Sequence, residues 1–217
     1  MKIYDFPLSP NCRKVRAIVY ELGRPAEFRG VDLFKGEQRA PQVLALNPNT
    51  KVPILVDGDF VLWESNAICA YLAQGTPLLP TVPRARAEVD RWCSWELAHL
   101  GPAIRKVAFE RLVKPLTGRG QPDARVVDEG VAEYTRFASV LDASLGDREH
   151  LAGSLSIADF VLASMFSIGA TVGLETAPHP RVNAWLARIL GRPSMKRALA
   201  DAQASMPHHR DTVARAS

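Results

Sequence analysis

The sequence predicts a protein in two parts, an α/β domain built on a small mixed sheet followed by an all-helical domain. Three observations support this prediction. Strand-like and helix-like patterns alternate over about the first 75 residues, in the order βαβα and then ββα. Residues 75–83 (GTPLLPTVP) hold three prolines and a glycine, which is typical of a linker. No convincing strand pattern follows them.

The first domain begins with a strand and an amphipathic helix. Residues 2–6 (KIYDF) are strand-like, and an apolar stripe at helical spacing follows, formed by Val15, Ile18, Val19 and Leu22. Gly23 is expected to end this helix. The other elements expected here are a strand (26–31), a short helix (37–46), a hairpin turning at Asp57-Gly58-Asp59 and a helix (64–73).

The second domain is expected to contain helices only. Their expected ranges are 84–112, 123–145, 157–170, 180–190 and 194–204. Leu155-Ser156-Ile157-Ala158-Asp159 predicts a helix start, with Ser156 as the N-cap and Asp159 as its capping-box partner. The last dozen residues are polar, and we expect them to be loose.

Composition narrows the class of protein. The chain has 217 residues, 47% hydrophobic and 23% charged, and a net charge of +4 without a block of like charges, so a nucleic-acid partner is not indicated. No apolar run reaches the roughly 18 residues of a membrane helix, so no membrane partner is expected. Three sparse cysteines, Cys12, Cys69 and Cys93, favour a reducing compartment, and we expect a cytoplasmic location.

Histidine spacing gives no sign of a metal centre. His99, His150 and His179 are isolated in sequence, and His208-His209 lies in the polar tail. None of them matches the spacing of zinc ligands, so we expect a protein without a metal.

The tetrapeptide Ser9-Pro10-Asn11-Cys12 lies between the first strand and the first helix. Ser is a preferred N-cap and Pro is favoured at the first helical position, so a purely structural role explains the residues. A functional role is the alternative, because the spacing is that of a CxxC motif with Ser in place of the first Cys. A helix N-terminus also stabilises an anion such as a thiolate, and a hydroxyl can donate a hydrogen bond to one.

Two further segments allow the same two interpretations. Pro53, after Lys51 and Val52, suits the first residue of a strand, and a cis bond before it is an alternative. Glu64 and Ser65 follow a strand and begin a helix, where they either cap it or bind a carboxylate ligand.

Taken together and in order, these segments resemble the cytosolic glutathione S-transferases. The motifs that carry the resemblance are S-P-N-C-R-K-V-R, G-E-Q-R-A-P, N-P-N-T-K-V-P, W-E-S-N-A-I and G-S-L-S-I-A-D, and it covers about residues 1–204. It points to the serine type, similar to bacterial theta and phi members. It implies a thioredoxin-like glutathione-binding domain over residues 1–76, an all-helical domain over residues 84–217 that contributes the electrophile site, and a homodimer.

The resemblance also implies roles for individual residues. Ser9 would hydrogen-bond the glutathione sulfur, and the backbone of Val52, before a cis Pro53, would pair with the cysteinyl residue. Glu64 and Ser65 would hold the γ-glutamyl end. Gln38 and Arg39 stand where relatives have a His-Lys pair near the glycyl carboxylate, and Lys51 stands at a common Gln position. Leu8, Arg105 and Phe109 are expected to line the electrophile site.

The implied activity is glutathione transfer, in which the thiol is activated as a thiolate that attacks an electrophilic, mostly apolar small molecule. Two alternatives use the same fold. One is a glutathione-dependent disulfide reductase or peroxidase, and the other is a non-catalytic binding protein. The presence of Ser9, Pro53, Glu64 and Ser65 argues against the non-catalytic binding protein. Ser9 argues against a redox mechanism that uses a protein thiol, though not against one that uses only glutathione.

Overall fold

The computed structural model describes the backbone of residues 1–214 and the side chains of residues 1–206. Its contacts divide the chain into two compact units. The first contains Met1–Gln74 together with the segment from Pro193 onward, and the second contains Gly75–Arg192. The sequence prediction grouped everything from residue 84 onward with the helical half, whereas the last helix, α10 (Pro193–Ala214), groups with the first unit.

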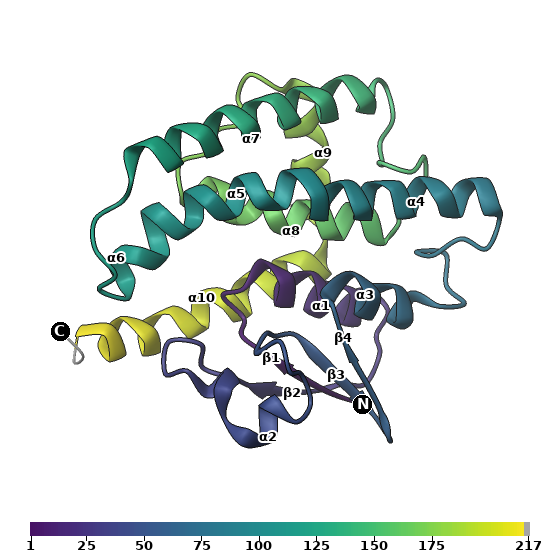
Figure 1. Cartoon of the computed structure of the whole chain (residues 1–217). Coiled ribbons are helices and arrows are strands. Elements are labelled where there is room, and N and C mark those ends of the chain that lie inside the picture. The colour runs from purple at the N-terminus through teal and green to yellow at the C-terminus, as the bar shows by residue number, and fades with distance from the viewer. Residues whose placement is uncertain (215–217) are drawn as a thin grey trace. The chain divides into compact units, whose positions relative to one another are not determined.

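The first unit is built on a mixed sheet, as predicted, and its four strands lie in the order β2-β1-β3-β4 (Figure 1). The strands are β1 (Lys2–Asp5), β2 (Glu27–Gly30), β3 (Ile54–Asp57) and β4 (Phe60–Trp63). β2 runs parallel to β1, while β3 is antiparallel to both β1 and β4. The predicted hairpin joins β3 to β4, and Gly58 takes the φ of +64° that its tight turn requires.

Helix α1 (Pro10–Glu21) is buried along most of its length. Helices α3 (Ser65–Ala73) and α10 pack against it within this unit (Figure 1). The apolar stripe accounts for only one face, yet the structure also buries Arg13, Lys14 and Arg16. The expected helix over 37–46 is instead a 3₁₀ turn, η1 (Glu37–Arg39), followed by α2 (Pro41–Leu44).

A buried ion-pair network joins α10 to α1 and β1. The guanidinium of Arg16 donates to both carboxylate oxygens of Asp5, at 2.5 and 3.1 Å, and to Asp201 of α10 at 2.7 Å. The Tyr20 hydroxyl also donates to Asp201, at 2.5 Å. A charged residue on α1 tolerates burial here because it has charged partners on two other elements.

α10 continues well beyond the predicted end at residue 204. Its backbone is helical to Ala214, so the tail that was expected to be loose is mostly helix. The side chains of His208 and His209 lie outside the described residues.

The second unit is helical, as predicted. Its helices are α4 (Pro83–Trp95), η2 (Glu96–Leu100), α5 (Gly101–Ala108), η3 (Phe109–Val113), α6 (Lys114–Leu116), α7 (Ala124–Leu145), α8 (Ile157–Thr171) and α9 (Pro180–Leu190). The first five follow one another in the chain without a break, and η2 and η3 are π-helical turns. Among the described residues, no helix is both long and apolar enough to cross a membrane.

The predicted capping box is present at the start of α8. The Ser156 N–H donates to the Asp159 carboxylate at 2.9 Å, and the Trp185 indole N–H donates to the same carboxylate at 2.8 Å. The Asp159 carboxylate therefore caps the start of α8 and also binds the Trp185 side chain of α9.

We expect Arg16→Ala to lower the free energy of unfolding by about 3–5 kcal/mol, because it leaves the carboxylate of Asp5 buried without its partner. Arg91→Ala is the matched control. Its pair with Glu88 is exposed, so its loss should cost at most about 1 kcal/mol. Urea unfolding of both variants measures the difference, and equal midpoints would contradict the assignment.

Candidate functional site

The strand register brings three of the predicted motifs to one end of the sheet. Ile54, the first residue of β3, pairs with Tyr4 near the end of β1 and with Trp63 at the end of β4. The loop after β1, the segment before β3 and the segment after β4 therefore leave the sheet at the same edge. These are the segments that carry Ser9, Val52-Pro53 and Glu64-Ser65.

Ser9 stands at the N-cap position of α1 but does not cap it through its side chain. Its carbonyl oxygen accepts the N–H groups of Cys12 and Arg13, at 3.1 and 2.9 Å. Its hydroxyl makes no capping hydrogen bond to the first turn of α1, all of which the structure describes. The structural interpretation of Ser9 as a side-chain cap thus lacks its hydrogen bond, and a half-buried hydroxyl remains at the positive end of the helix dipole.

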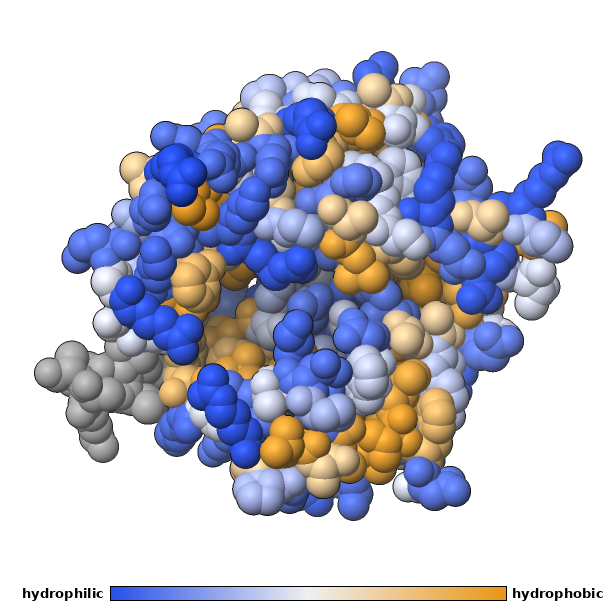
Figure 2. Space-filling model, viewed as in Figure 1, coloured by the Kyte–Doolittle hydropathy of each residue, from blue (hydrophilic) through white to orange (hydrophobic). Residues whose placement is uncertain are grey.

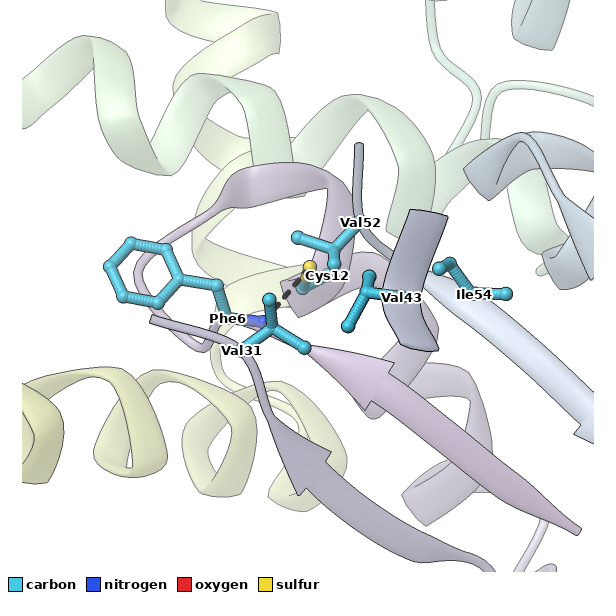
Figure 3. Packing of buried hydrophobic residues seen from close by; sticks show 6 residues of the cluster. All are labelled: Phe6, Cys12, Val31, Val43, Val52 and Ile54. Carbon is cyan, nitrogen blue, oxygen red and sulfur yellow. Dashed lines mark hydrogen bonds between the residues drawn. The ribbon is translucent and has the colours of Figure 1, made fainter. Parts of the chain in front are cut away.

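Cys12 lies one turn further into α1 and is fully buried. It belongs to a core cluster with Phe6, Val31, Val43, Val52 and Ile54, and the Phe6 N–H donates to its sulfur at 3.3 Å (Figure 3). Burial, reinforced by the charge of Asp5, raises the pKa of the Cys12 thiol to about 12, and hydrogen bonds from Phe6 and Ser9 offset this only in part. Cys12 is therefore a neutral packing group near pH 7 rather than a reactive thiolate.

The segment before β3 is shaped by Asn47, a residue that the sequence analysis did not single out. Asn47 is buried, its amide donates to the carbonyl oxygen of Lys51 at 2.8 Å, and its side-chain oxygen accepts the N–H of Asn49 at 3.0 Å. The peptide bond that follows, Val52-Pro53, is cis, as the resemblance implied. In the sequence, Asn47-Pro48 indicates a turn. It does not indicate that the Asn47 side chain holds the backbone at Lys51.

Glu64 has a backbone conformation that is unusual for a residue with a side chain. Its φ is +72° and its ψ is 108°, between the end of β4 and the start of α3. Such strain costs about 1–3 kcal/mol and concentrates at functional sites. Its carboxylate makes no capping hydrogen bond to α3, which is described throughout, and Glu64 is exposed.

Ser65 ties the start of α3 to α1. Ser65 is buried, and its hydroxyl donates to the side-chain oxygen of Asn11 at 3.4 Å. The N-termini of α1 and α3 are thereby held together, so the positive ends of two helix dipoles lie close to one another. That arrangement suits a ligand carrying negative charge.

The remaining predicted residues of the first unit lie outside these contacts. Gln38 and Arg39 form the 3₁₀ turn η1, where the buried side-chain oxygen of Gln38 has no hydrogen-bond partner among the described residues. Arg39 and Lys51 are exposed. Ala40, the next residue after Arg39, packs against the cluster that contains Cys12 and Val52, which anchors η1 to that core. The roles assigned to Gln38, Arg39 and Lys51 stay predictions.

The residues predicted for an electrophile belong to different units. Leu8 packs against the core cluster of the first unit. Arg105 lies on α5 and Phe109 begins η3, and both are exposed in the second unit. Their shared role stays a prediction. Among the described side chains, no group of three or more His, Cys, Asp or Glu is placed to hold a metal ion.

Comparison with known proteins gives a consistent result along the chain. The family model for the glutathione S-transferase N-terminal domain matches residues 3–79, and that for the C-terminal domain matches residues 100–193. Glutathione S-transferase 3 of Zea mays is 37% identical over 209 residues, which cover 92% of this chain and 93% of that protein.

Solved structures agree with these sequence matches. Glutathione transferase F7 from Populus trichocarpa superposes with a TM-score of 0.86 at 30% identity, covering 93% of this chain and 98% of that one. Glutathione S-transferase I from maize, in complex with an atrazine glutathione conjugate, gives 0.84 at 30% identity, covering 93% and 97%.

We expect Cys12 in the native protein to react far more slowly with iodoacetamide at pH 8 than it does in the urea-unfolded chain, because the folded thiol titrates near pH 12. Peptide mass spectrometry after timed alkylation measures this rate. If native Cys12 reacts as fast as it does in the unfolded chain, the assignment of Cys12 as a buried, protonated thiol is wrong.

Proposed function

The chain belongs to the glutathione S-transferase family and is a glutathione transferase, and from that premise we propose that Ser9 activates the glutathione thiol. The activated thiolate attacks an electrophilic carbon of a mostly apolar small molecule and forms a thioether, either as a leaving group departs with its bonding electrons or, in an addition, as the adjacent carbon takes up a proton. One observation carries the choice of Ser9: it stands at the N-terminus of α1, and its hydroxyl is hydrogen-bonded to the Cys12 thiol instead of capping the helix backbone. The finer assignment, a serine-type enzyme similar to theta and phi members, rests on the same residue.

The energetics of thiol activation are within reach of these groups. A free thiol with a pKa near 8.5 is only about 3% ionised at pH 7, and lowering the pKa by about 2 units takes roughly 2.7 kcal/mol. A hydrogen bond from Ser9 to the thiolate is worth about 1.5–3 kcal/mol, and the dipole of α1 adds about 0.3–1 kcal/mol. Together these contributions account for the required shift.

The other groups at this end of the sheet suit the rest of glutathione. The backbone of Val52 is proposed to pair with the cysteinyl backbone. Glu64 offers a carboxylate to the γ-glutamyl ammonium, while Ser65 and the start of α3 offer donors to the γ-glutamyl carboxylate. Arg39, assisted by Gln38 and Lys51, is proposed to bind the glycyl carboxylate, because an arginine makes a bidentate pair with it.

An exposed aromatic patch supports the proposal of a homodimer. Phe60 of β4 and Tyr71 of α3 are 45% and 40% exposed, and their rings are 5.3 Å apart. β4 is an edge strand of the sheet. Apolar surface is visible over the strand-bearing part of the first unit in Figure 2. Such a patch on an edge strand is typical of an interaction surface. A cytoplasmic location is a further proposal, consistent with the absence of a disulfide bond among the three cysteines, all of which lie in the described part of the chain.

Ser9→Ala should cut glutathione conjugation about 10- to 100-fold, since it removes one charge-assisted hydrogen bond from the thiolate. The pKa of the enzyme-bound thiol, followed by thiolate absorbance against pH, should rise toward that of free glutathione. Cys12→Ala should retain most of the activity. An inactive Cys12→Ala beside a normal Ser9→Ala would instead indicate a cysteine-type thiol transferase.

Ser65→Ala and Arg39→Ala should each weaken binding of S-hexylglutathione by about ten-fold, the effect of one hydrogen bond to a charged group. Arg91→Ala, which changes an exposed arginine in the second unit, is the control and should bind like the wild type. Isothermal titration measures all three. Wild-type affinity in Arg39→Ala would remove Arg39 from the site, and no binding by the wild type at millimolar ligand would refute the glutathione site.

Light scattering at micromolar concentration should give about twice the 23.8 kDa chain mass. Phe60→Arg should shift the protein toward the monomer, because a charge placed in an apolar contact is unpaired. Val82→Arg, at an exposed apolar residue of the second unit, should leave the mass unchanged. A wild-type mass near that of one chain would rule out the dimer.

A further inference from the structure

Lys14 is a charged residue whose location is costly. It lies on α1 between Cys12 and Arg16, and its side chain has no exposed surface. Burying an ammonium group carries a large desolvation penalty, and an apolar residue of similar size usually serves the fold equally well or better. The presence of a lysine at this buried position therefore calls for an explanation beyond packing.

A hydrogen bond connects this lysine to the start of α3. The Lys14 ammonium donates to the side-chain oxygen of Asn66 at 2.6 Å. Asn66 directly follows Ser65, whose hydroxyl donates to Asn11 on α1. Two bonds therefore link the first two turns of α1 to the first turn of α3, the helices that carry Ser9 and Ser65, and α1 and α3 lie side by side in Figure 1.

The chemistry of the pair fixes the orientation of Asn66. An ammonium can only donate hydrogen bonds, so the atom of Asn66 that faces it must be the amide oxygen. The Asn66 amide is thereby prevented from flipping. Asn66 lies two residues after Glu64, whose positive φ is unfavourable for a residue with a side chain. Neighbouring contacts must therefore hold the backbone of Glu64 in this conformation.

We propose that Lys14 is a positioning residue for the γ-glutamyl end of glutathione, acting through Asn66 to hold Glu64 and Ser65 in register with Ser9. The inference rests on the proposed function. Lys14 is not placed in contact with the ligand. Its positive charge lies behind the N-terminus of α3, where the helix dipole is also positive, so both favour a bound carboxylate.

The test separates positioning from a purely structural role. Lys14→Met should raise the KM for glutathione about ten-fold, while kcat at saturating glutathione and the KM for the electrophile change less than about two-fold. Asn66→Leu should reproduce this pattern, and the double variant should be no worse than either single variant, because both remove the same bond. Lys14→Arg, which keeps the charge and the donors, should restore most of the affinity. Lys106→Met, at a lysine paired with Glu133 in the second unit, is the matched control and should keep the wild-type KM.

Each result bears on the proposal. A Lys14→Met enzyme with altered thermal stability and an unchanged KM for glutathione would overturn it, as would additive effects in the double variant. If Lys14→Met does not fold, Asn66→Leu and Lys14→Arg supply the same comparison, and a wild-type KM in Asn66→Leu overturns the proposal. A wild type that fails to bind S-hexylglutathione would refute the proposed function itself, and this inference with it.

Discussion

The buried pair between Asp5 and Arg16 is the interaction on which the rest of the first unit depends. Asp5 ends β1 and Arg16 lies in the second turn of α1, so the pair closes the stretch of chain that carries Ser9. Neither charge tolerates burial alone. The two hydrogen bonds from the Arg16 guanidinium to the Asp5 carboxylate therefore hold the end of β1 and the second turn of α1 together. Asp201 completes the arrangement from the far end of the chain, which explains why α10 belongs to this unit.

Around that anchor, the candidate site is assembled mostly from backbone. The starts of α1 and α3 supply the positive ends of two helix dipoles, and a buried asparagine, Asn47, shapes the segment that leads to the cis bond before Pro53. The strained backbone of Glu64 is held in place by the paired end of β4 and by the contact of Ser65 with Asn11. The stable sheet and core cluster thus support local conformations that would be unfavourable in isolation.

The same residue types have different roles at different helix starts. Ser156 and Asp159 form the capping box that the sequence predicts, because a box is complete within four residues and needs no distant partner. Ser9 and Glu64 also stand at N-cap positions, yet neither side chain caps its helix. In the first helix the carbonyl oxygen of Ser9 accepts first-turn N–H groups, and its hydroxyl is hydrogen-bonded to the Cys12 thiol. Residue type alone could not separate these cases.

The sequence by itself determined the order and nature of nearly every element, because hydrophobic periodicity, turn glycines and prolines act within a few residues of one another. It also named Ser9, Pro53, Glu64 and Ser65 as the residues to examine. Only the tertiary structure decided that Arg13, Lys14 and Arg16 are buried, that α10 packs on α1, and that Asn47 and Asn66 are hydrogen-bonded to Lys51 and Lys14. The physical reason is that each of these outcomes depends on how a polar group is compensated. Asn47 finds its partner four residues away, but the partner of Lys14 lies 52 residues away, and Arg16 binds both Asp5, 11 residues away, and Asp201, 185 residues away, beyond the reach of any local pattern.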